Sequence, residues 1–388
     1  MFKHIFADLH IHIGSDHKQN PVKISGSKNL TLRNILQVAS EEKGIELIGI
    51  VDSHVPNILI EIKELLSSGE ANELSDGGIR YQNVTLLLAS EIEVYDEYSQ
   101  GPFHVLVFLP TIATMTNFSQ WLSDKMKNIH LSSQRIYCTG RELQRKVKAL
   151  DGLFIPAHVF TPFKSLYGRG VEKSLTEVFD PEAIDAIELG LSSDTEMADA
   201  IFELHHYSYV TNSDSHSLRK IGREYQKLKM KEASFKELVY CLTEKDNREI
   251  VSNYGMNPRL GKYYRTVCQT CFTEVAIDTN VCPKCQSKKI VNGVYDRIQQ
   301  LKTNHSKVPK RPPYIYQVPL EYIPGLGNKT LSRLLDAFGT EMNIIHHVPY
   351  DELNQVVPNR IADYILKMRA GKLEIAAGGG GKYGRVIE

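Results

Sequence analysis

Residues 6–17 read FADLHIHIGSDH, an apolar run that ends in a dense group of ionisable side chains. Successive side chains of an extended strand point to opposite faces, so His10 and His12 share one face. Two imidazoles on one face suit a metal ion, although a pair of surface histidines has the same spacing. The segment therefore predicts a strand with potential metal ligands at its carboxyl end, and the rest of the chain distinguishes the two interpretations.

Strand-like apolar segments recur through the first 250 residues, with helical patterns between most of them. They are HIFADL (4–9), IELIGIV (45–51), VTLLLAS (84–90), FHVLVFL (103–109), GLFIPAH (152–158), AIDAIEL (183–189) and YSYVTNS (207–213). Between the first two, Thr31 is expected to cap a helix and Gly44 to end it in the left-handed conformation. Strands that alternate with helices predict a parallel α/β sheet, either closed into a barrel or doubly wound.

Ionisable side chains lie near the ends of all seven segments. Parallel α/β folds gather their active sites at the carboxyl ends of the strands, so most of these side chains are expected to meet there. His104 differs because it lies near the start of its strand. The set comprises Asp8, His10, His12, Asp16, His17, Asp52, His54, Glu91, His104, His158, Glu188, Asp214 and His216.

The donor atoms of this set are imidazole nitrogens and carboxylate oxygens, with no sulfur. Such donors suit divalent zinc, manganese, iron or magnesium. The set is too large for one ion, whereas two or three closely spaced ions would use it, as in metal-assisted phosphoester hydrolysis. The sequence therefore predicts two or three divalent ions and a reaction that needs no serine or cysteine nucleophile.

The order HxH, DxH, Glu, His, His, DxH over residues 1–250 resembles the PHP (polymerase and histidinol phosphatase) domain. The resemblance implies a distorted (β/α)7 barrel that is the metal-dependent catalytic domain. It implies as metal ligands His10, His12, His17, His54, Glu91, His104, His158, Asp214 and His216. The residues expected to be catalytic are His10, His12, Glu91, Asp214 and His216.

Two of these assignments have alternatives within the sequence. Asp16 or solvent can replace His17, whose spacing from His12 varies in the family. Glu93 competes with Glu91, which we prefer because it lies nearer the end of its strand. The carboxylates Asp8, Asp52 and Glu188 are then expected to orient the histidine ligands.

A second metal site is predicted from residues 268–285, CQTCFTEVAIDTNVCPKC. The spacing C-x2-C-x10-C-x2-C is that of a zinc ribbon, in which four thiolates hold one structural zinc. Without an export signal, disulfides are a poorer explanation of the cluster. The ligands are Cys268, Cys271, Cys282 and Cys285, in a domain predicted to span residues 251–312.

The charge of the chain is divided between its two parts, although its formal net charge is zero. Residues 255–388 contain 19 Lys and Arg against 11 Asp and Glu, a net charge of +8, which leaves −8 on the first 254 residues. Within 284–311 there are eight basic residues and one acidic residue. This pattern favours a polyanion bound by the C-terminal part and chemistry carried out by the N-terminal part.

The segment YIPGLGNKTLSRLLDAFG (322–339) resembles a helix-hairpin-helix, whose glycines let backbone N–H groups approach a phosphate. A degenerate second copy is expected in 343–370, with VVPNR in place of the glycine hairpin. The chain ends AAGGGGKYGRVIE, either a loop that contacts DNA or a simple tail. In the domain predicted for 313–388, the expected DNA-binding residues are Gly325, Gly327, Lys329, Thr330, Lys382 and Tyr383.

A barrel, a four-cysteine ribbon and a helix-hairpin-helix in this order resemble the endonuclease Q family over nearly the whole chain. Loops HVFTPFKSLYGRG (158–170), ELGLSSD (188–194) and SDSHSLRKIGREY (213–225) add to the resemblance. It implies cleavage of DNA on the 5′ side of deaminated bases (uracil, hypoxanthine, xanthine) and abasic sites, leaving 3′-hydroxyl and 5′-phosphate ends. The damaged base is expected to flip into a pocket. The pocket candidates are Thr161, Gly168, Ser192 and Ser193.

Other functions remain open at this level. A PHP-type 3′–5′ exonuclease or end-processing enzyme fits the basic tail, whereas a small-molecule phosphatase has no need of it. An inactive barrel on a DNA-binding protein is disfavoured by the nearly complete ligand set. The expected partner is single- or double-stranded DNA, with a sliding clamp left open. No apolar run of 18 or more residues occurs and no signal peptide is apparent, so we expect a cytoplasmic protein without a membrane span.

Overall fold

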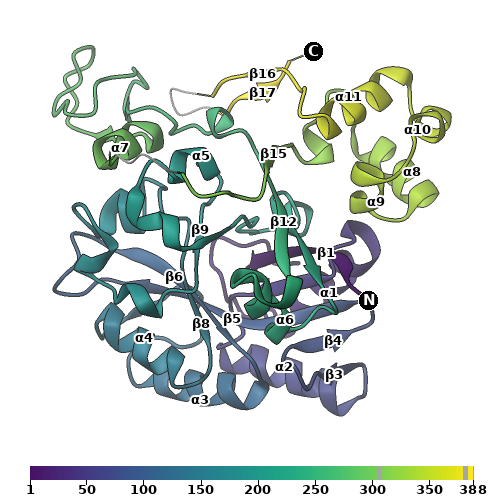
Figure 1. Cartoon of the computed structure of the whole chain (residues 1–388), viewed down its shortest axis with the longest axis horizontal. Helices are drawn as coiled ribbons and strands as arrows, with labels where there is room; N and C mark the ends of the chain where they lie inside the picture. Colours follow the sequence, from purple (N-terminus) through teal and green to yellow (C-terminus); the bar gives the residue numbers. More distant parts are fainter. Residues whose placement is uncertain (304–307, 379–382, 388) are drawn as a thin grey trace.

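The computed structural model describes residues 1–303, 308–378 and 383–387 and is organised around a distorted barrel (Figure 1). Seven strands form the barrel: β1 (Lys3–Ile11), β2 (Leu47–Ile50), β5 (Val84–Val94), β6 (Phe103–Leu109), β8 (Leu153–Pro156), β9 (Ala186–Glu188) and β10 (Ser208–Val210). The circle is closed by backbone hydrogen bonds from Asp185, next to β9, to Phe154 of β8, from Val159, beyond β8, to Glu188 of β9, and between β1 and the segment after β10. These are the seven segments predicted from the apolar runs.

The predicted parallel arrangement is wrong for β6. This strand pairs antiparallel with both β5 and β8, whereas β1, β2 and β5 pair in parallel. The connection 95–102 is too short for the crossover that a parallel neighbour requires, so β5 and β6 form a hairpin. The start of β6 consequently lies at the carboxyl edge of the other strands, which brings His104 to the same end as the other candidate ligands.

The barrel sheet extends beyond the seven strands at both ends. Strands β11, β12 and β15 continue it from β1, and β3, β4 and β7 attach to β5. The added strands are β3 (Ala71–Glu73), β4 (Ile79–Tyr81), β7 (Arg135–Ile136), β11 (Tyr225–Met230), β12 (Glu249–Gly255) and β15 (Tyr314–Tyr316). The predicted boundary after residue 250 falls within β12, and β15 returns to the barrel sheet after the ribbon.

One buried cluster fills the barrel interior. Ile5, Ala7 and Leu9 alternate along β1 and join this cluster together with residues from each of the other six barrel strands. Thr31 caps the first helix by accepting from the Asn34 N–H, and Gly44 has a φ of 73°, as predicted. The helices of this part are α1 (Leu32–Val38), α2 (Pro56–Ser67), α3 (Ile112–Ser123), α4 (Gly140–Lys148), α5 (Thr195–Ala198) and α6 (Phe235–Leu242).

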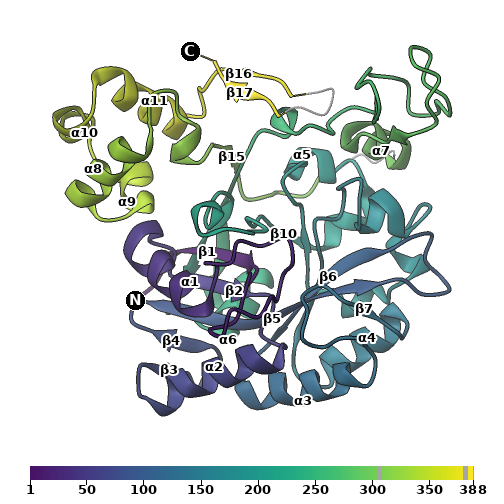
Figure 2. The same cartoon turned by 180° about the vertical axis from the view of Figure 1, so that it is seen from behind.

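The C-terminal elements lie on one side of the barrel in two separate groups, with a small hairpin between them (Figure 1, Figure 2). The ribbon group contains β13 (Val267–Cys268), β14 (Ile290–Val291) and α7 (Val294–Leu301). The helical group contains α8 (Asn328–Phe338), α9 (Glu341–His346), α10 (Tyr350–Val356) and α11 (Asn359–Arg369). The hairpin pairs β16 (Ile375–Ala376) with β17 (Arg385–Val386). Among the described residues, no helix combines the length and apolar character needed to cross a bilayer.

Candidate metal centre

Three candidate ligands meet at the carboxyl end of the barrel. One nitrogen each of His10 and His12 and one oxygen of Asp214 lie within 4.8 Å of one another. Asp214 Oδ1 is 3.5 Å from the Nε2 atoms of both histidines. The predicted common face of the two histidines is thus observed, and it is completed by a carboxylate more than 200 residues away in the chain.

Glu91 joins this group to a second one that contains His104 and His158. Its Oε1 lies 2.8 Å from His104 Nδ1, 3.2 Å from His158 Nε2 and 3.5 Å from His10 Nε2. Its Oε2 lies 3.4 Å from His12 Nε2. A carboxylate in this position would be a ligand candidate for a centre of two ions, the kind of centre that two-metal phosphoester hydrolases use.

Several donor atoms of the candidate ligands are buried without hydrogen-bond partners in the described parts of the chain. They are His10 Nε2, His12 Nε2, both ring nitrogens of His54, His104 Nε2 and Asp214 Oδ1. Buried polar atoms are nearly always paired, so a concentration of unpaired nitrogens at one place needs an explanation. Divalent metal ions provide one, because imidazole and carboxylate donors match them. The residues present therefore fit a divalent metal centre.

Buried carboxylates hold two of the histidines from behind. Glu188 Oε1 is 3.0 Å from His10 Nδ1, and Asp52 Oδ2 is 3.2 Å from His12 Nδ1. These bonds fix the ring orientation and leave each Nε2 for a ligand. Burial lowers the pKa of His10, but Glu188 and Asp214 outweigh burial and hold this pKa well above its usual value.

Asp8 has a different role from the one predicted. Its oxygens accept hydrogen bonds from the backbone N–H groups of Ser213 at 3.0 Å and Gly222 at 2.8 Å. It therefore fixes the backbone next to Asp214 rather than a histidine ring. The sequence places Asp8 two residues before His10 but gives no sign of these partners, which lie more than 200 residues further on.

Two candidate ligands of the centre adopt left-handed backbone conformations. His158 has a φ of 30° and Asp214 a φ of 45°. Non-glycine residues rarely occupy this region, and such strain concentrates at functional sites. Gly190 packs so closely that an added Cβ would lie 2.6 Å from the Cβ of His158. A side chain at position 190 would thus displace this ligand.

The other predicted ligands lie around the centre with less direct contacts. His54 is fully buried, and burial lowers its pKa to about 4. The ring centroid of His216 is 4.8 Å from that of His12, and burial lowers the pKa of His216 to about 4. His17 is partly exposed, and its Nδ1 lies 3.0 Å from Glu61. Whether these three residues bind metal stays a prediction.

The two alternative carboxylates have other partners. Asp16 accepts hydrogen bonds from the side-chain amides of Asn20 at 2.8 Å and Asn57 at 2.7 Å, which stabilises its own loop. Glu93 forms an ion pair with Lys164 at 2.8 Å, and its Oε2 lies 3.8 Å from His104 Nε2, farther than the 2.8 Å from Glu91 Oε1 to His104 Nδ1. Glu91, rather than Glu93, is therefore the carboxylate that the structure brings into the ligand group.

Lys23 is a residue of this centre that sequence reasoning missed. Its Nζ lies 3.2 Å from Glu91 Oε2 and 2.6 Å from Ser133 Oγ, and Ser133 also bonds Glu91. Burial lowers the pKa of Lys23, but Glu91, Asp52 and Asp214 together raise it, so the ammonium group is charged. Lys23 belongs to no motif, and only the fold brings it next to Glu91.

A cavity of about 680 Å³ opens above the centre. Its walls include the loop 161–164, residues 190–192, the segment 260–263 and residues 383–386 of the C-terminal hairpin. Of the predicted pocket residues, Thr161 and Ser192 line this cavity, as does Tyr383. The Thr161 hydroxyl also lies 3.2 Å from His158 Nδ1, which links the wall to a ligand.

The remaining candidates for the pocket and tail are placed differently. The Gly168 N–H donates to Ser165 Oγ, and an added Cβ at 168 would lie 2.1 Å from the Thr161 carbonyl oxygen. The Ser193 hydroxyl is buried and donates to the Leu189 carbonyl. Neither residue is among those that line the cavity. Lys382 lies outside the described residues.

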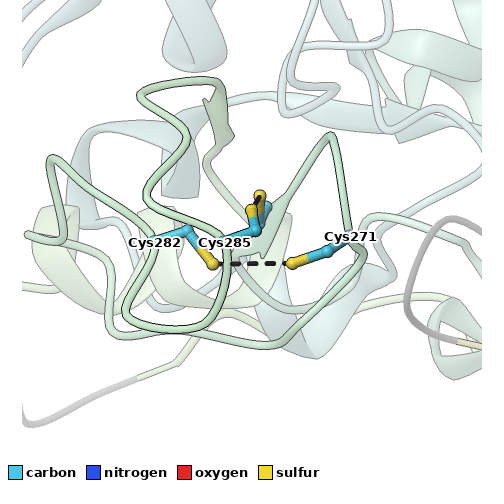
Figure 3. A group of neighbouring side chains, drawn as sticks. Cys271, Cys282 and Cys285 are labelled. Carbon is cyan, nitrogen blue, oxygen red and sulfur yellow. Dashed lines mark hydrogen bonds between the residues drawn. The ribbon is translucent and has the colours of Figure 1, made fainter.

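The four cysteines of the ribbon converge as predicted, and Figure 3 shows Cys271, Cys282 and Cys285 close together. The Sγ atoms of Cys271 and Cys282 are 3.5 Å apart, and so are those of Cys268 and Cys285. These separations are too long for disulfides. A tetrahedral zinc ion with Zn–S bonds of about 2.3 Å requires sulfur separations of roughly 3.8 Å. The cluster therefore fits one structural zinc.

The predicted hairpin glycines lie at the start of α8. Gly325 has a φ of 82°, and Gly327 is the N-cap residue, with no atom within 4 Å of an added Cβ. Lys329 is exposed in the first turn, next to Thr330. The segment VVPNR, residues 356–360, joins α10 to α11, where the degenerate second hairpin was predicted. An exposed helix N-terminus without side chains at its cap is open to a phosphate group.

Comparison with known proteins identifies full-length relatives. The chain is 54% identical over 384 residues to the uncharacterized protein YqxK of Bacillus subtilis (strain 168), covering 99% of both chains. Its structure resembles that of the novel lesion-specific endonuclease PfuEndoQ from Pyrococcus furiosus, with a TM-score of 0.85, 32% identity and coverage of 99% of this chain and 95% of that one. No family model matches the chain.

A second solved structure provides a nucleic-acid complex. It is endonuclease Q bound to a 27-mer duplex substrate with an abasic lesion at the active site. The TM-score is 0.84 at 32% identity, and the match covers 99% of this chain and 96% of that one. The similarity thus extends over the barrel, the ribbon and the C-terminal helices together.

Proposed function

The chain belongs to the endonuclease Q family, and we propose that it cuts DNA on the 5′ side of deaminated bases and abasic sites. The protein is a metal-dependent endodeoxyribonuclease that acts on damaged DNA. The proposed lesions are uracil, hypoxanthine, xanthine and abasic sites, and the proposed products carry 3′-hydroxyl and 5′-phosphate ends.

The observation that carries this proposal is the group of unpaired buried donors around Glu91 at the floor of a large cavity. We propose two or three divalent ions there, of zinc, manganese, magnesium or iron, and one structural zinc in the ribbon. When bound, such ions act as Lewis acids towards the phosphodiester and lower the pKa of water.

The protein's own residues prepare this centre for an anionic substrate. Burial would raise the pKa of Glu91, but His104, Lys23 and His12 hold it well below its usual range. Burial acts in the same way on Asp214, and His10 and His12 hold its pKa well below the usual range. Both groups therefore stay ionised, as metal ligands require. Lys23 adds a positive charge within the cavity, where a phosphate oxygen can approach.

We place the damaged base in the cavity beside this centre. Deaminated and missing bases pair weakly, so rotating such a nucleotide out of the duplex costs less than the few kcal/mol needed for a normal base. The Thr161 and Ser192 hydroxyls are the proposed contacts to the carbonyl that deamination creates. Phe163, Tyr263 and Tyr383 add aromatic faces to the cavity wall.

The C-terminal groups are proposed to hold the DNA on the barrel. Backbone N–H groups near Gly325 and Gly327, together with Lys329 and Thr330, are the proposed phosphate contacts. Tyr383 and Arg385 extend the cavity wall from the hairpin between the two groups. Contacts of this kind position a strand without selecting a sequence, which suits recognition of a lesion in any context.

The test uses oligonucleotides with blocked ends and one internal uracil, hypoxanthine or abasic site, beside an undamaged strand. We expect one cut, 5′ to each lesion, by the wild type and none by Asp214→Asn. Lys231→Ala is the control, because it removes a charge from an exposed position just beyond the end of β11, and it should retain activity. Equal cutting of the undamaged strand would contradict lesion specificity. Digestion that needs an unblocked end would favour the exonuclease alternative.

A further inference from the structure

A cluster of exposed tyrosines and basic side chains lies on the barrel outside the cavity. Tyr95, Tyr98 and Tyr137 are 39%, 49% and 50% exposed. The Arg135 guanidinium carbon lies 4.6 Å from the ring centroid of Tyr95 and 5.3 Å from that of Tyr137. Lys127 lies 5.7 Å from the Tyr137 ring. We call these five residues the β7 surface.

The local fold holds the β7 surface in place. Strand β7 pairs in parallel with the end of β5, with Arg135 opposite Glu93 and Ile136 opposite Val94. Side-chain alternation buries Ile136 and turns Arg135 and Tyr137 to the outside. The Tyr137 N–H donates to the Lys125 carbonyl at 2.8 Å, which fixes the chain beyond the strand. The surface is therefore presented by ordered backbone.

The surroundings of the β7 surface are basic within an acidic domain. Residues 121–150 contain seven Lys and Arg and two acidic residues, whereas the first 254 residues contain 27 against 35. The nearby Asp96 accepts hydrogen bonds from the N–H groups of Gly140 and Tyr98. In the described part of the chain, Arg135 and Lys127 have no carboxylate within ion-pair distance. Their charges thus remain available to an anion.

The same segment of chain connects the β7 surface to the metal centre. Ser132 Oγ lies 3.1 Å from His12 Nδ1, and Ser133 bonds Glu91. Ser133 and Tyr137 are four residues apart in the chain, so their Cα atoms lie at most about 14 Å from one another. A strand in duplex form covers this distance in about four nucleotides, since it rises about 3.4 Å per nucleotide. A strand cut at the centre can therefore reach the surface within a few nucleotides.

We propose that the β7 surface binds the nucleic-acid strand that leaves the metal centre on one side of the cut. The tyrosine rings stack on bases, and Arg135 and Lys127 face phosphates, a combination that tolerates any sequence. This inference rests on the proposed function, since it names a further binding site for the same substrate. In the competing explanation, the cation–π contacts only stabilise the loop 95–102.

The test measures DNA binding by the full-length protein made inactive by Asp214→Asn, with the same divalent metal present in every sample. Fluorescence anisotropy gives Kd for single-stranded oligonucleotides with one uracil and arms of unequal length. Adding Tyr137→Ala should raise Kd about tenfold through the loss of stacking. Tyr137→Phe keeps the ring and should bind like the parent. Arg135→Ala should reduce the slope of log Kd against log salt by about 0.7, and the control Lys231→Ala should leave it unchanged.

Arm length provides an independent measurement. Shortening one arm to fewer than about four nucleotides should weaken binding by the parent protein and should not weaken binding by Tyr137→Ala further. Unchanged Kd and unchanged salt slope in both Tyr137→Ala and Arg135→Ala would overturn the proposal. So would a variant whose melting temperature falls while its affinity stays the same, because the contacts would then be structural.

Failure of this inference is separable from failure of the proposed function. If the wild type cuts lesions but the variants bind normally, the β7 surface is not a binding site and the nuclease assignment stands. If the wild type cuts no lesion but Tyr137→Ala still weakens binding, the β7 surface is a DNA-binding site and the proposed lesion-specific cleavage is wrong.

Discussion

The two candidate metal sites of this molecule are built in opposite ways. The barrel centre collects ligands from strands spread over 200 residues, and buried carboxylates such as Glu188 orient its histidines. The ribbon takes four cysteines from 18 residues, between strands β13 and β14 of two residues each. The barrel has a large core that forms its centre in advance, whereas the ribbon has almost no core. The comparison indicates that the barrel folds first and then binds its metal ions, whereas the ribbon folds only when it binds zinc.

Removal of zinc from the ribbon should have the largest effect. Binding of structural zinc supplies on the order of 10 kcal/mol to the folding of such units. With Cys271→Ser, we expect amide hydrogens of residues 266–291 to lose protection while β1 and β5 keep theirs. Hydrogen exchange by mass spectrometry and the zinc content measure this difference. Cys138→Ser, outside the cluster, is the control, and unchanged protection of the ribbon would contradict the comparison.

Substitution of Glu91, the carboxylate between the two ligand groups of the barrel, should have the second largest effect. Glu91→Gln removes the negative charge between the two ligand groups, and we expect kcat/KM for lesion cleavage to fall by about a thousandfold. The fold should persist because the barrel core is unchanged, which circular dichroism can check. Glu93→Gln, two residues further on, is the matched control and should retain most activity. Equal losses of kcat/KM in the two variants would show that Glu91 is no more important for cleavage than Glu93.

A smaller effect is expected from the carboxylates behind the histidines. Glu188→Gln weakens the hydrogen bond that orients His10, and such changes typically lower metal affinity by about 10- to 100-fold. Competition with a chelator measures this affinity. Glu237→Gln provides a control, since Glu237 is a buried carboxylate paired with Arg248 away from the centre. A loss of stability without a loss of metal affinity in Glu188→Gln would show that the carboxylate serves only the fold.

The smallest expected effect is a pH-dependent loss of stability at the contact between the helical group and the barrel. His346 stacks on Phe6 with ring centroids 4.6 Å apart, and burial lowers its pKa from 6.5 to about 3, with Lys227, His347 and Arg369 acting in the same direction. The unfolded chain binds this proton more tightly, so stability should fall as the pH drops from 6.5 towards 3. Urea unfolding at about pH 7 and about pH 5 measures the loss. The loss should shrink in His346→Phe, and an equal loss in both proteins would exclude His346 as its source.

Much of this architecture could be predicted from local sequence patterns. Apolar runs gave the seven barrel strands, and cysteine spacing gave the ribbon, because both signals lie within a few residues of one another. The positions of His10, His12, Glu91, His158 and Asp214 followed from the rule that parallel strands gather side chains at one end.

What could not be predicted depends on contacts between distant segments. Lys23 belongs to no motif, and it joins the centre only because the fold places it against Glu91. Asp8 holds the backbone at Ser213 and Gly222, although the resemblance to the PHP domain led us to expect that it orients a histidine ligand. The direction of β6 depended on the length of a loop rather than on the apolar pattern, which is the same for a strand of either direction.

That reversed strand makes part of the metal centre a local structure. Glu91 lies opposite Leu106 and Glu93 opposite His104, so Glu91 and His104 are diagonal neighbours on one face of a single hairpin. A slip of one residue in this pairing would turn His104 to the other face and separate the two ligands. Conversely, insertions in the loop 95–102 leave the pairing intact. Evolution can therefore vary the loop that carries Tyr95 and Tyr98, and with it the DNA contacts that we propose for this loop, while the distance between two candidate metal ligands stays fixed.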